Sequence, residues 1–100
     1  MIKHVVFFKF KPEIGAAERE QALADLRALP EKIEEIREFQ VGTDVLRTPR
    51  SWDAVLVSAF DSLETLGIYA RHEAHAPIVA RFAELCAEIG AVDYEYDQKG

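Results

Sequence analysis

WDAVLVSAF, residues 52–60, is the clearest β-strand signal in this chain of 100 residues. Side chains alternate between the two faces of a strand, so each face is read as every second residue. One face is predicted to carry Trp52, Ala54, Leu56, Ser58 and Phe60, and the other Val55, Val57 and Ala59. Because both faces are largely apolar, we expect this strand to lie inside a sheet that is covered on both sides.

The beginning of the chain shows the same two-sided pattern. Within Ile2–Phe10, one face carries His4, Val6, Phe8 and Phe10, and the other carries Val5 and Phe7 together with Lys3 and Lys9. Two further strands are predicted at Glu38–Val45, with a bulge at Gly42, and at Val92–Tyr96. The chain is therefore expected to form four strands.

Two helices are predicted before the last third of the chain. The first runs from about Ala16 to Leu29, where Pro30 ends it, and a short turn is expected within residues 32–37. The second opens with Asp61 as its N-cap and runs to about residue 70, because Glu64 completes a capping-box pattern.

A last helix is predicted between Pro77, which suits a first helical turn, and Gly90, which can end a helix in a left-handed conformation. Its apolar stripe is Ile78, Phe82, Leu85, Cys86 and Ile89. Cys86 is the only cysteine, which excludes an intramolecular disulfide. We expect it to be a packed thiol and not a nucleophile.

This order of elements predicts one α+β domain over residues 1–100 with the ferredoxin-like βαββαβ plan. In that plan an antiparallel four-stranded sheet has its helices on one side. The other face is left open and here would carry Val5, Phe7, Val55, Val57 and Ala59. Since such an apolar patch usually marks an interface, we expect a homodimer in which two open sheet faces meet, a dimeric α/β barrel.

The composition excludes several kinds of partner. The formal net charge is −6, which argues against a nucleic acid and against anionic lipid surfaces. No apolar run approaches the roughly 20 residues of a membrane span, and no signal-peptide pattern opens the chain. A cytoplasmic location is therefore expected.

The chain's proton-transfer groups are concentrated in Tyr69-Ala70-Arg71-His72-Glu73-Ala74-His75. Neutral imidazole can accept a proton at neutral pH, and a tyrosine hydroxyl can donate to a developing enolate oxygen. The alternatives are that His75 braces the connector before the last helix and that Tyr69 packs with its hydroxyl satisfied. His4 is either a hydrogen-bonded core histidine or a third member of the same pocket.

Other polar residues are interpreted structurally. His72 is expected to face solvent or the interface. The three-residue spacing of His72 and His75 lacks a fourth ligand and the His-Glu-x-x-His pattern, so no metal is predicted. Asp93, Glu95 and Asp97 alternate on the last strand and are interpreted as a solvated or salt-bridged edge.

Five segments in this order resemble the stress-responsive dimeric α/β-barrel (Dabb) family. They are Lys3-His4-Val5-Val6-Phe7-Phe8-Lys9-Phe10-Lys11, Val41-Gly42-Thr43-Asp44, Phe60-Asp61-Ser62-Leu63-Glu64-Thr65-Leu66, the Tyr69–His75 segment and Val92-Asp93-Tyr94. The resemblance covers nearly the whole chain and implies the dimeric ferredoxin-like barrel.

The resemblance does not imply one activity. The best understood relatives are similar to plant olivetolic acid cyclase, which closes a polyketide chain by aldol condensation without a cofactor. On matching positions the resemblance implies His75 as general base, Tyr69 as its helper and His4 as a pocket histidine. Walls for a small apolar ligand are expected from Phe8, Leu56 and Phe82, between the sheet and the helices.

The chain departs from that pattern at two positions. Ala54 stands where the cyclase has another pocket histidine, and Glu73 stands where a proline is usual between the paired histidines. Some plant members hold a cation with backbone carbonyls, and the matching positions here are Pro30, Ile33 and Ile36.

Three functions stay open from the sequence. The first is cofactor-independent proton transfer on a small carbonyl or polyketide-like compound, as in a cyclase or isomerase. The second is a non-catalytic, stress-related dimer that binds a small apolar ligand. The third is a cofactor-free quinone-forming monooxygenase, which rests on analogy of fold alone.

Overall fold

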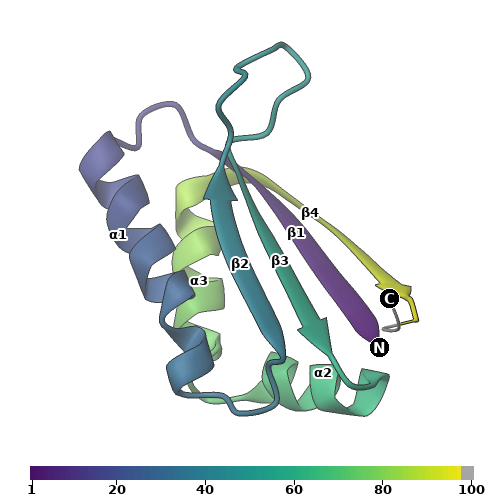
Figure 1. The fold of residues 1–100 in the computed structure, drawn as a ribbon. Helices are drawn as coiled ribbons and strands as arrows, with labels where there is room; N and C mark the ends of the chain where they lie inside the picture. Colours follow the sequence, from purple (N-terminus) through teal and green to yellow (C-terminus); the bar gives the residue numbers. More distant parts are fainter. Residues whose placement is uncertain (98–100) are drawn as a thin grey trace.

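The computed structural model describes residues 1–97 and confirms the βαββαβ plan, with helices packed on one side of an antiparallel sheet (Figure 1). Its elements are β1 (Ile2–Phe10), α1 (Ala16–Arg27), the 3-10 turn η1 (Leu29–Glu31), β2 (Glu38–Thr43), β3 (Ala54–Phe60), α2 (Leu63–Arg71), α3 (Ala76–Leu85) and β4 (Cys86–Glu95). The strand order is β2-β3-β1-β4. β1 and β3 are therefore central, as their two-sided apolar patterns predicted. Among residues 1–97, none of the helices has the length and apolarity needed to cross a bilayer.

The hydrophobic core fills the space between the helices and the sheet face that they cover, here called the helix-side face. α1 contributes Leu23 and Leu26, and α3 contributes Phe82, all of them buried. These side chains pack against Phe8 of β1 and Leu56 of β3. In Figure 1, α3 lies behind the sheet, α1 lies to its left beside β2, and α2 lies across its lower end.

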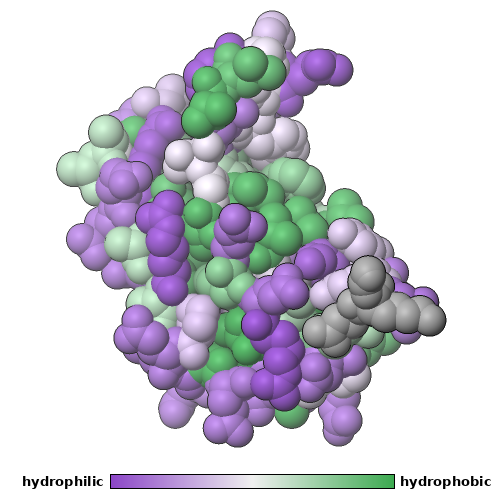
Figure 2. Space-filling model, viewed as in Figure 1, coloured by the Kyte–Doolittle hydropathy of each residue, from purple (hydrophilic) through white to green (hydrophobic). Residues whose placement is uncertain are grey.

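None of the helices within residues 1–97 covers the second sheet face, here called the open face (Figure 1). The strand register places Val5 opposite both Val57 and Val92 on this face, and it places Phe7 opposite Val55. Figure 2 shows hydrophobic surface gathered over the middle of the molecule in this view. The sheet thus presents an apolar surface that its own described helices leave uncovered.

Trp52 lies outside β3 and on the open face, so the prediction that it shares a face with Ala54 is wrong. Its ring packs 5.9 Å from the ring of Phe7 between centroids, and the Lys9 ammonium lies 5.1 Å from the Trp52 ring. The physical reason is that strict alternation holds only within a strand, and β3 begins at Ala54. Trp52 therefore extends the apolar open face.

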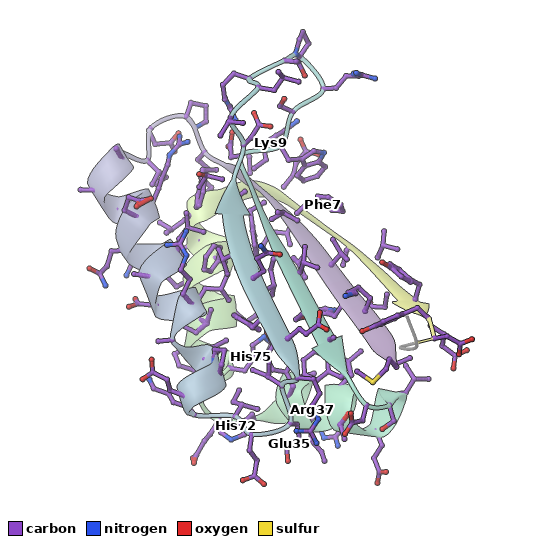
Figure 3. All side chains as sticks on the ribbon, viewed as in Figure 1. Phe7, Lys9, Glu35, Arg37, His72 and His75 are labelled. Carbon is purple, nitrogen blue, oxygen red and sulfur yellow. The ribbon has the colours of Figure 1, made fainter. Side chains whose placement is uncertain are left out.

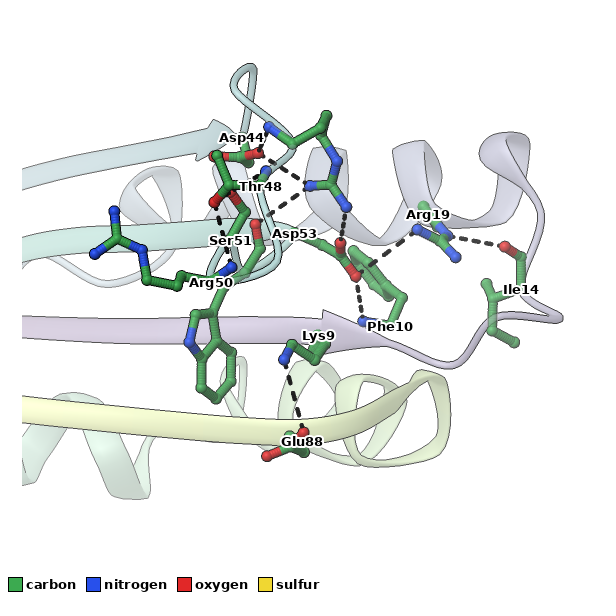
Figure 4. Close-up of polar contacts among 12 residues, drawn as sticks. Lys9, Phe10, Ile14, Arg19, Asp44, Thr48, Arg50, Ser51, Asp53 and Glu88 are labelled. Atoms are coloured by element: carbon green, nitrogen blue, oxygen red, sulfur yellow. Dashed lines mark hydrogen bonds and ion pairs between the residues drawn. The ribbon is translucent and has the colours of Figure 1, made fainter.

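The long connection between β2 and β3 protrudes from the sheet (Figure 1) and is anchored by Asp53. The Asp53 carboxylate accepts hydrogen bonds from the Phe10 backbone N–H at 2.8 Å and from the Arg47 guanidinium at 2.8 Å (Figure 4). Burial by itself raises the pKa of Asp53, but the bonds from Arg47 and Phe10 outweigh it and the pKa is lowered. The ion pair and the backbone bond together tie the loop to the end of β1.

The N-cap of α2 is Ser62, so the predicted cap at Asp61 with Glu64 is wrong by one residue. The Ser62 hydroxyl accepts from the Thr65 backbone N–H, and the Thr65 hydroxyl accepts from the Ser62 N–H. Asp61 pairs instead with the Arg37 guanidinium at 2.9 Å. A carboxylate held by a guanidinium is not free to cap the helix, and the next residue takes that role.

The last helix ends at Leu85 and β4 begins at Cys86, so the predicted helix to Gly90 and strand from Val92 are wrong at this boundary. The cause is pairing with β1, whose edge binds β4 from Ile2 to Phe10. Gly90 lies within the strand under Trp52, where an added Cβ would come within 3.5 Å of the indole.

Smaller boundaries also differ from the predictions. The expected bulge at Gly42 is wrong, because Gly42 pairs regularly with Val55 and the irregularity lies between Lys9 and Phe10.

Cys86 is buried, and burial raises the pKa of its thiol to about 11. Although it lies at the start of a strand and not on a helix, it is a packed thiol, as predicted.

Candidate functional site

A cavity of about 190 Å³ lies between the helix-side face and the helices. All six residues that the sequence singled out border it: His4, Phe8, Leu56, Tyr69, His75 and Phe82. It is also lined by five apolar residues that the sequence analysis did not assign to a site: Val6, Leu26, Ile78, Val79 and Ile89. Three of these, Val6, Leu26 and Ile78, lie on the predicted faces of strand and helices. Ile89 was predicted to be apolar and inward-facing but on the last helix, whereas it lies on β4. Val79 was outside the predicted apolar stripe of the last helix.

Tyr69 lies on α2 with its ring against the wall of the cavity. The residue is 1% exposed, and its hydroxyl has no hydrogen-bond partner within residues 1–97. Burial raises the pKa of Tyr69 to about 12, so the phenol is neutral and can donate a proton in a hydrogen bond. A buried hydroxyl without a protein partner is rare and costly, so this donor is available to a water or a ligand. The Tyr96 hydroxyl has no partner within residues 1–97 either, but it does not border this cavity.

His75 immediately precedes α3 and packs on the Tyr69 ring, with 4.4 Å between the ring centroids. Its Nδ1 lies 3.2 Å from the Ala70 carbonyl oxygen. Because a carbonyl can only accept, Nδ1 carries the hydrogen and Nε2 keeps a free lone pair. This bond also braces the connector before α3. The structural interpretation of His75 is therefore compatible with a chemical one.

The surroundings of His75 favour the neutral imidazole. Its pKa is lowered below 6.5, first because burial disfavours the charged form and further because His4 and His72 are nearby. The hydrogen bond to the Ala70 carbonyl opposes this shift without cancelling it. At neutral pH the side chain is therefore a base and not an acid.

His4 lies on β1 with its ring 6.0 Å from the Tyr69 ring in a T-shaped arrangement. Its Nδ1 is bonded to the Asp93 carboxylate of β4, and the register places the two residues directly opposite. Since an ionised carboxylate can only accept, this bond places a hydrogen on Nδ1 and leaves Nε2 free of it. Asp93 was predicted to belong to a solvated or salt-bridged edge, and the structure bonds it to a histidine of the cavity.

The pairing of Asp93 with His4 was missed by sequence reasoning. Asp93 falls on the helix-side face only through the register of β4 against β1, which the sequence does not state. On the other side of His4, the Ser58 hydroxyl of β3 donates to the His4 backbone carbonyl at 3.1 Å. Both cavity histidines are thus held by Nδ1 with Nε2 available.

His72 does not border this cavity, so the two histidines of the Tyr69–His75 segment are separated by the fold. The His72 Nδ1 accepts from the Ala74 backbone N–H at 3.0 Å, and Figure 3 shows the residue near Glu35, at the opposite end of the molecule from the loop between β2 and β3. Within residues 1–97, no group of three or more His, Cys, Asp or Glu side chains converges to hold a metal ion. The carbonyl cation site implied near Pro30 stays a prediction.

The fold and the cavity together define a ferredoxin-like α+β protein with an apolar pocket between sheet and helices and three proton-transfer groups at that pocket. Residues 2–96 match the model of the stress responsive A/B barrel domain. The chain belongs to this family, as the five quoted segments indicated.

Relatives agree with this assignment. An uncharacterized protein of Streptomyces coelicolor is 33% identical over 99 residues, which cover 96% of this chain and all of that protein. A dimeric protein of unknown function with a ferredoxin-like fold from Bacteroides fragilis is 31% identical, with a TM-score of 0.80 and 95% of each chain covered. A hydroxynitrile lyase from Passiflora edulis has a TM-score of 0.86 at 21% identity, covering 99% of this chain and 95% of that chain, which is a likeness of fold.

Proposed function

We propose that this protein is a cofactor-independent enzyme that moves a proton next to the carbonyl group of a small apolar compound, as a cyclase or isomerase does. The single observation that carries the proposal is the partnerless Tyr69 hydroxyl at an apolar cavity that two histidines also border. The phenol is neutral and can donate, and the lowered pKa of His75 keeps its imidazole neutral with a basic Nε2. His4 has its Nδ1 bonded to Asp93, which leaves its Nε2 free of that bond.

The proposed step begins with His75 Nε2, which takes a proton from the carbon beside the carbonyl. The C–H electron pair moves toward the carbonyl oxygen, and the resulting enolate oxygen accepts a hydrogen bond from the Tyr69 hydroxyl. The enolate carbon then attacks a second carbonyl in the same molecule, and the imidazolium gives its proton to the alkoxide oxygen that forms there; alternatively, the imidazolium returns its proton to another carbon of the enolate system. Proton number and charge balance in both outcomes, and His4 is the second group that can take or return the proton.

We also propose that two copies pack through their open faces. The face carries Val5, Val57 and Val92 in one cross-strand row, and Tyr94 on the same strand edge is 47% exposed. The related protein from Bacteroides fragilis is dimeric. Association would remove this apolar row from water, and it would leave the cavity accessible because the cavity lies on the other side of the sheet.

A non-catalytic ligand-binding role is the second candidate. It is favoured by the lining of the cavity, in which eight of the eleven side chains are apolar and the rest are His4, Tyr69 and His75. Such a pocket binds apolar ligands with or without chemistry. The two candidates differ in whether a bound carbonyl compound exchanges hydrogen with water.

The decisive experiment follows solvent deuterium entering the carbon next to the carbonyl of small ketones by NMR. The matched variants are His75→Asn and His72→Asn, because asparagine can donate to the Ala70 carbonyl or accept from the Ala74 N–H as each histidine does. We expect His75→Asn to lower the exchange rate by about 10²–10⁴-fold and His72→Asn to leave it unchanged. Equal rates in wild type and His75→Asn would contradict the role of His75.

The pH dependence gives an independent readout. A lowered pKa means that neutral His75 persists below pH 6.5, so the rate should hold its plateau at pH 6.5 and decline only as the pH falls through the lower pKa of the folded state. Ligand binding without any deuterium exchange across the ketones tested would instead establish the non-catalytic role.

A further inference from the structure

The side chains that line the cavity and the volume of the cavity limit which ligands it can bind. We propose that its ligand is an uncharged carbonyl compound of about one six-membered ring, which enters between α3 and β4. The carbonyl group in this statement rests on the proposed function. The limits on charge and size rest on the cavity alone.

The charge limit follows from what lines the cavity. Among residues 1–97, no Lys, Arg, Asp or Glu side chain borders it. The lowered pKa of His75 keeps that imidazole neutral, and the Tyr69 phenol is neutral as well. A carboxylate or phosphate placed here would lose its hydration without gaining a Lys or Arg partner, which is more costly than burying a neutral carbonyl.

Asp93 adds to the exclusion of anions. Its carboxylate is bonded to the side of His4 that carries the hydrogen, so a negative charge lies one imidazole ring away from the cavity. The whole chain also has a formal net charge of −6. Both charges repel an approaching anion, the nearby one more strongly because salt screens distant charges.

The size limit follows from the volume. A cavity of about 150 Å³ in an engineered protein accommodates benzene. The present cavity of about 190 Å³ therefore holds one six-membered ring with roughly one or two further heavy atoms. The Tyr69 hydroxyl offers the hydrogen bond for one polar atom, and the apolar walls fit the ring.

The entrance is marked by the lining residues that remain exposed. Val79 of α3 is 50% exposed and Ile89 of β4 is 48% exposed, whereas Phe8, Leu56 and Phe82 are buried. A ligand therefore reaches the cavity between α3 and β4. Because Val79 is half exposed, its side chain can be changed without emptying the core.

The test measures dissociation constants by NMR titration of the full chain with four probes. Cyclohexanone and methylcyclohexanone represent the proposed class, oxocyclohexanecarboxylate adds a negative charge at similar size, and decalone adds a second ring. We expect the first two to bind, and the carboxylate and decalone to bind at least roughly tenfold more weakly. Equal or tighter binding of either, or no binding of any probe, overturns the proposal.

A matched pair of variants tests the charge argument at the entrance. Val79→Lys places a cation there and should strengthen binding of oxocyclohexanecarboxylate several-fold relative to binding of cyclohexanone by the same variant. Val45→Lys makes the same change in the loop between β2 and β3, where Val45 is 92% exposed, and should have no effect on either probe. An equal gain in both variants would show that net charge alone acts, and would contradict the entrance.

Failure of this inference is distinguishable from failure of the proposed function. Binding of the neutral single-ring probes without deuterium exchange leaves the inference on size and charge standing and removes the enzyme proposal. Deuterium exchange that is faster with the carboxylate or decalone than with the neutral single-ring probes leaves the enzyme proposal standing and removes the inference on size and charge.

Discussion

At the scale of single residues, the chemistry proposed for the pocket depends on the hydrogen bonds of two histidines and on a tyrosine hydroxyl that makes none within residues 1–97. His75 and His4 each use Nδ1 for a protein partner, the Ala70 carbonyl and the Asp93 carboxylate. The Tyr69 hydroxyl has none within residues 1–97. Two histidines with bonded Nδ1 atoms and a phenol hydroxyl without a described partner therefore meet at one cavity.

Replacing Tyr69 with phenylalanine separates stability from function. Tyr69→Phe removes a buried hydroxyl that bonds nothing in the described chain, so we expect the melting temperature to stay unchanged or to rise slightly. If the hydroxyl stabilises an enolate, the exchange rate should fall by about 10²–10³-fold. Thermal unfolding and the deuterium exchange assay measure the two effects. A melting temperature lowered by several degrees would show that the hydroxyl has a structural partner.

The Asp93 carboxylate is expected to position His4 by fixing which ring nitrogen carries the hydrogen. In Asp93→Asn the amide can donate to Nδ1, which moves the hydrogen of His4 to Nε2 and removes the basic atom from the cavity. Nitrogen chemical shifts of the His4 ring report this change directly. Glu95→Gln, on the same strand, is the control and should leave the His4 tautomer as in wild type. A wild-type His4 with its hydrogen on Nε2 would disprove the assignment.

At the scale of elements, α2 is short and carries both Tyr69 and the Ala70 carbonyl that orients His75. Its first turn is held by reciprocal bonds between Ser62 and Thr65. Loss of this cap would let the helix start fray and loosen two parts of the pocket at once.

Ser62→Ala should lower the free energy of unfolding by about 0.5–2 kcal/mol, because the Thr65 N–H loses its acceptor. Asp61→Ala should have a smaller effect, because Asp61 only makes an exposed ion pair with Arg37. Urea unfolding of both variants measures the difference. If Asp61→Ala is the more damaging, then the cap lies where the sequence pattern placed it and not where the structure does.

At the scale of the whole molecule, the open face carries apolar residues that the described helices leave uncovered (Figures 1 and 2). Val57 lies in the central strand β3, opposite Val5. A second copy placed against this face would cover it.

Val57→Lys should convert the proposed dimer to a monomer, because a charge at the centre of the interface loses its hydration without a partner. Ala24→Lys makes a comparable change at an exposed position of α1 and should leave the dimer intact. Sedimentation velocity at micromolar concentration measures both. A wild-type protein that sediments as a folded monomer would refute the proposed association.

Local patterns predicted the larger part of the fold. Alternation in β1 and β3 identified the two central strands and their faces, because the period of two in a strand depends only on neighbouring residues. The candidates His4, Tyr69 and His75 were found from residue type and from the family resemblance, and the faces of strand and helices placed apolar residues beside them. Their roles in chemistry stay predictions until activity is measured.

The sequence by itself determined the order of strands and helices, and which side chains could do chemistry, since propensity and periodicity are local. Only the tertiary structure decided that α3 ends at Leu85, that Asp93 bonds to His4 and that the Tyr69 hydroxyl has no partner within residues 1–97. The physical reason is pairing over long range. The edge of β1 binds β4 along its length, and this register overrides the helical spacing of Cys86 and Ile89 and sets what faces the cavity.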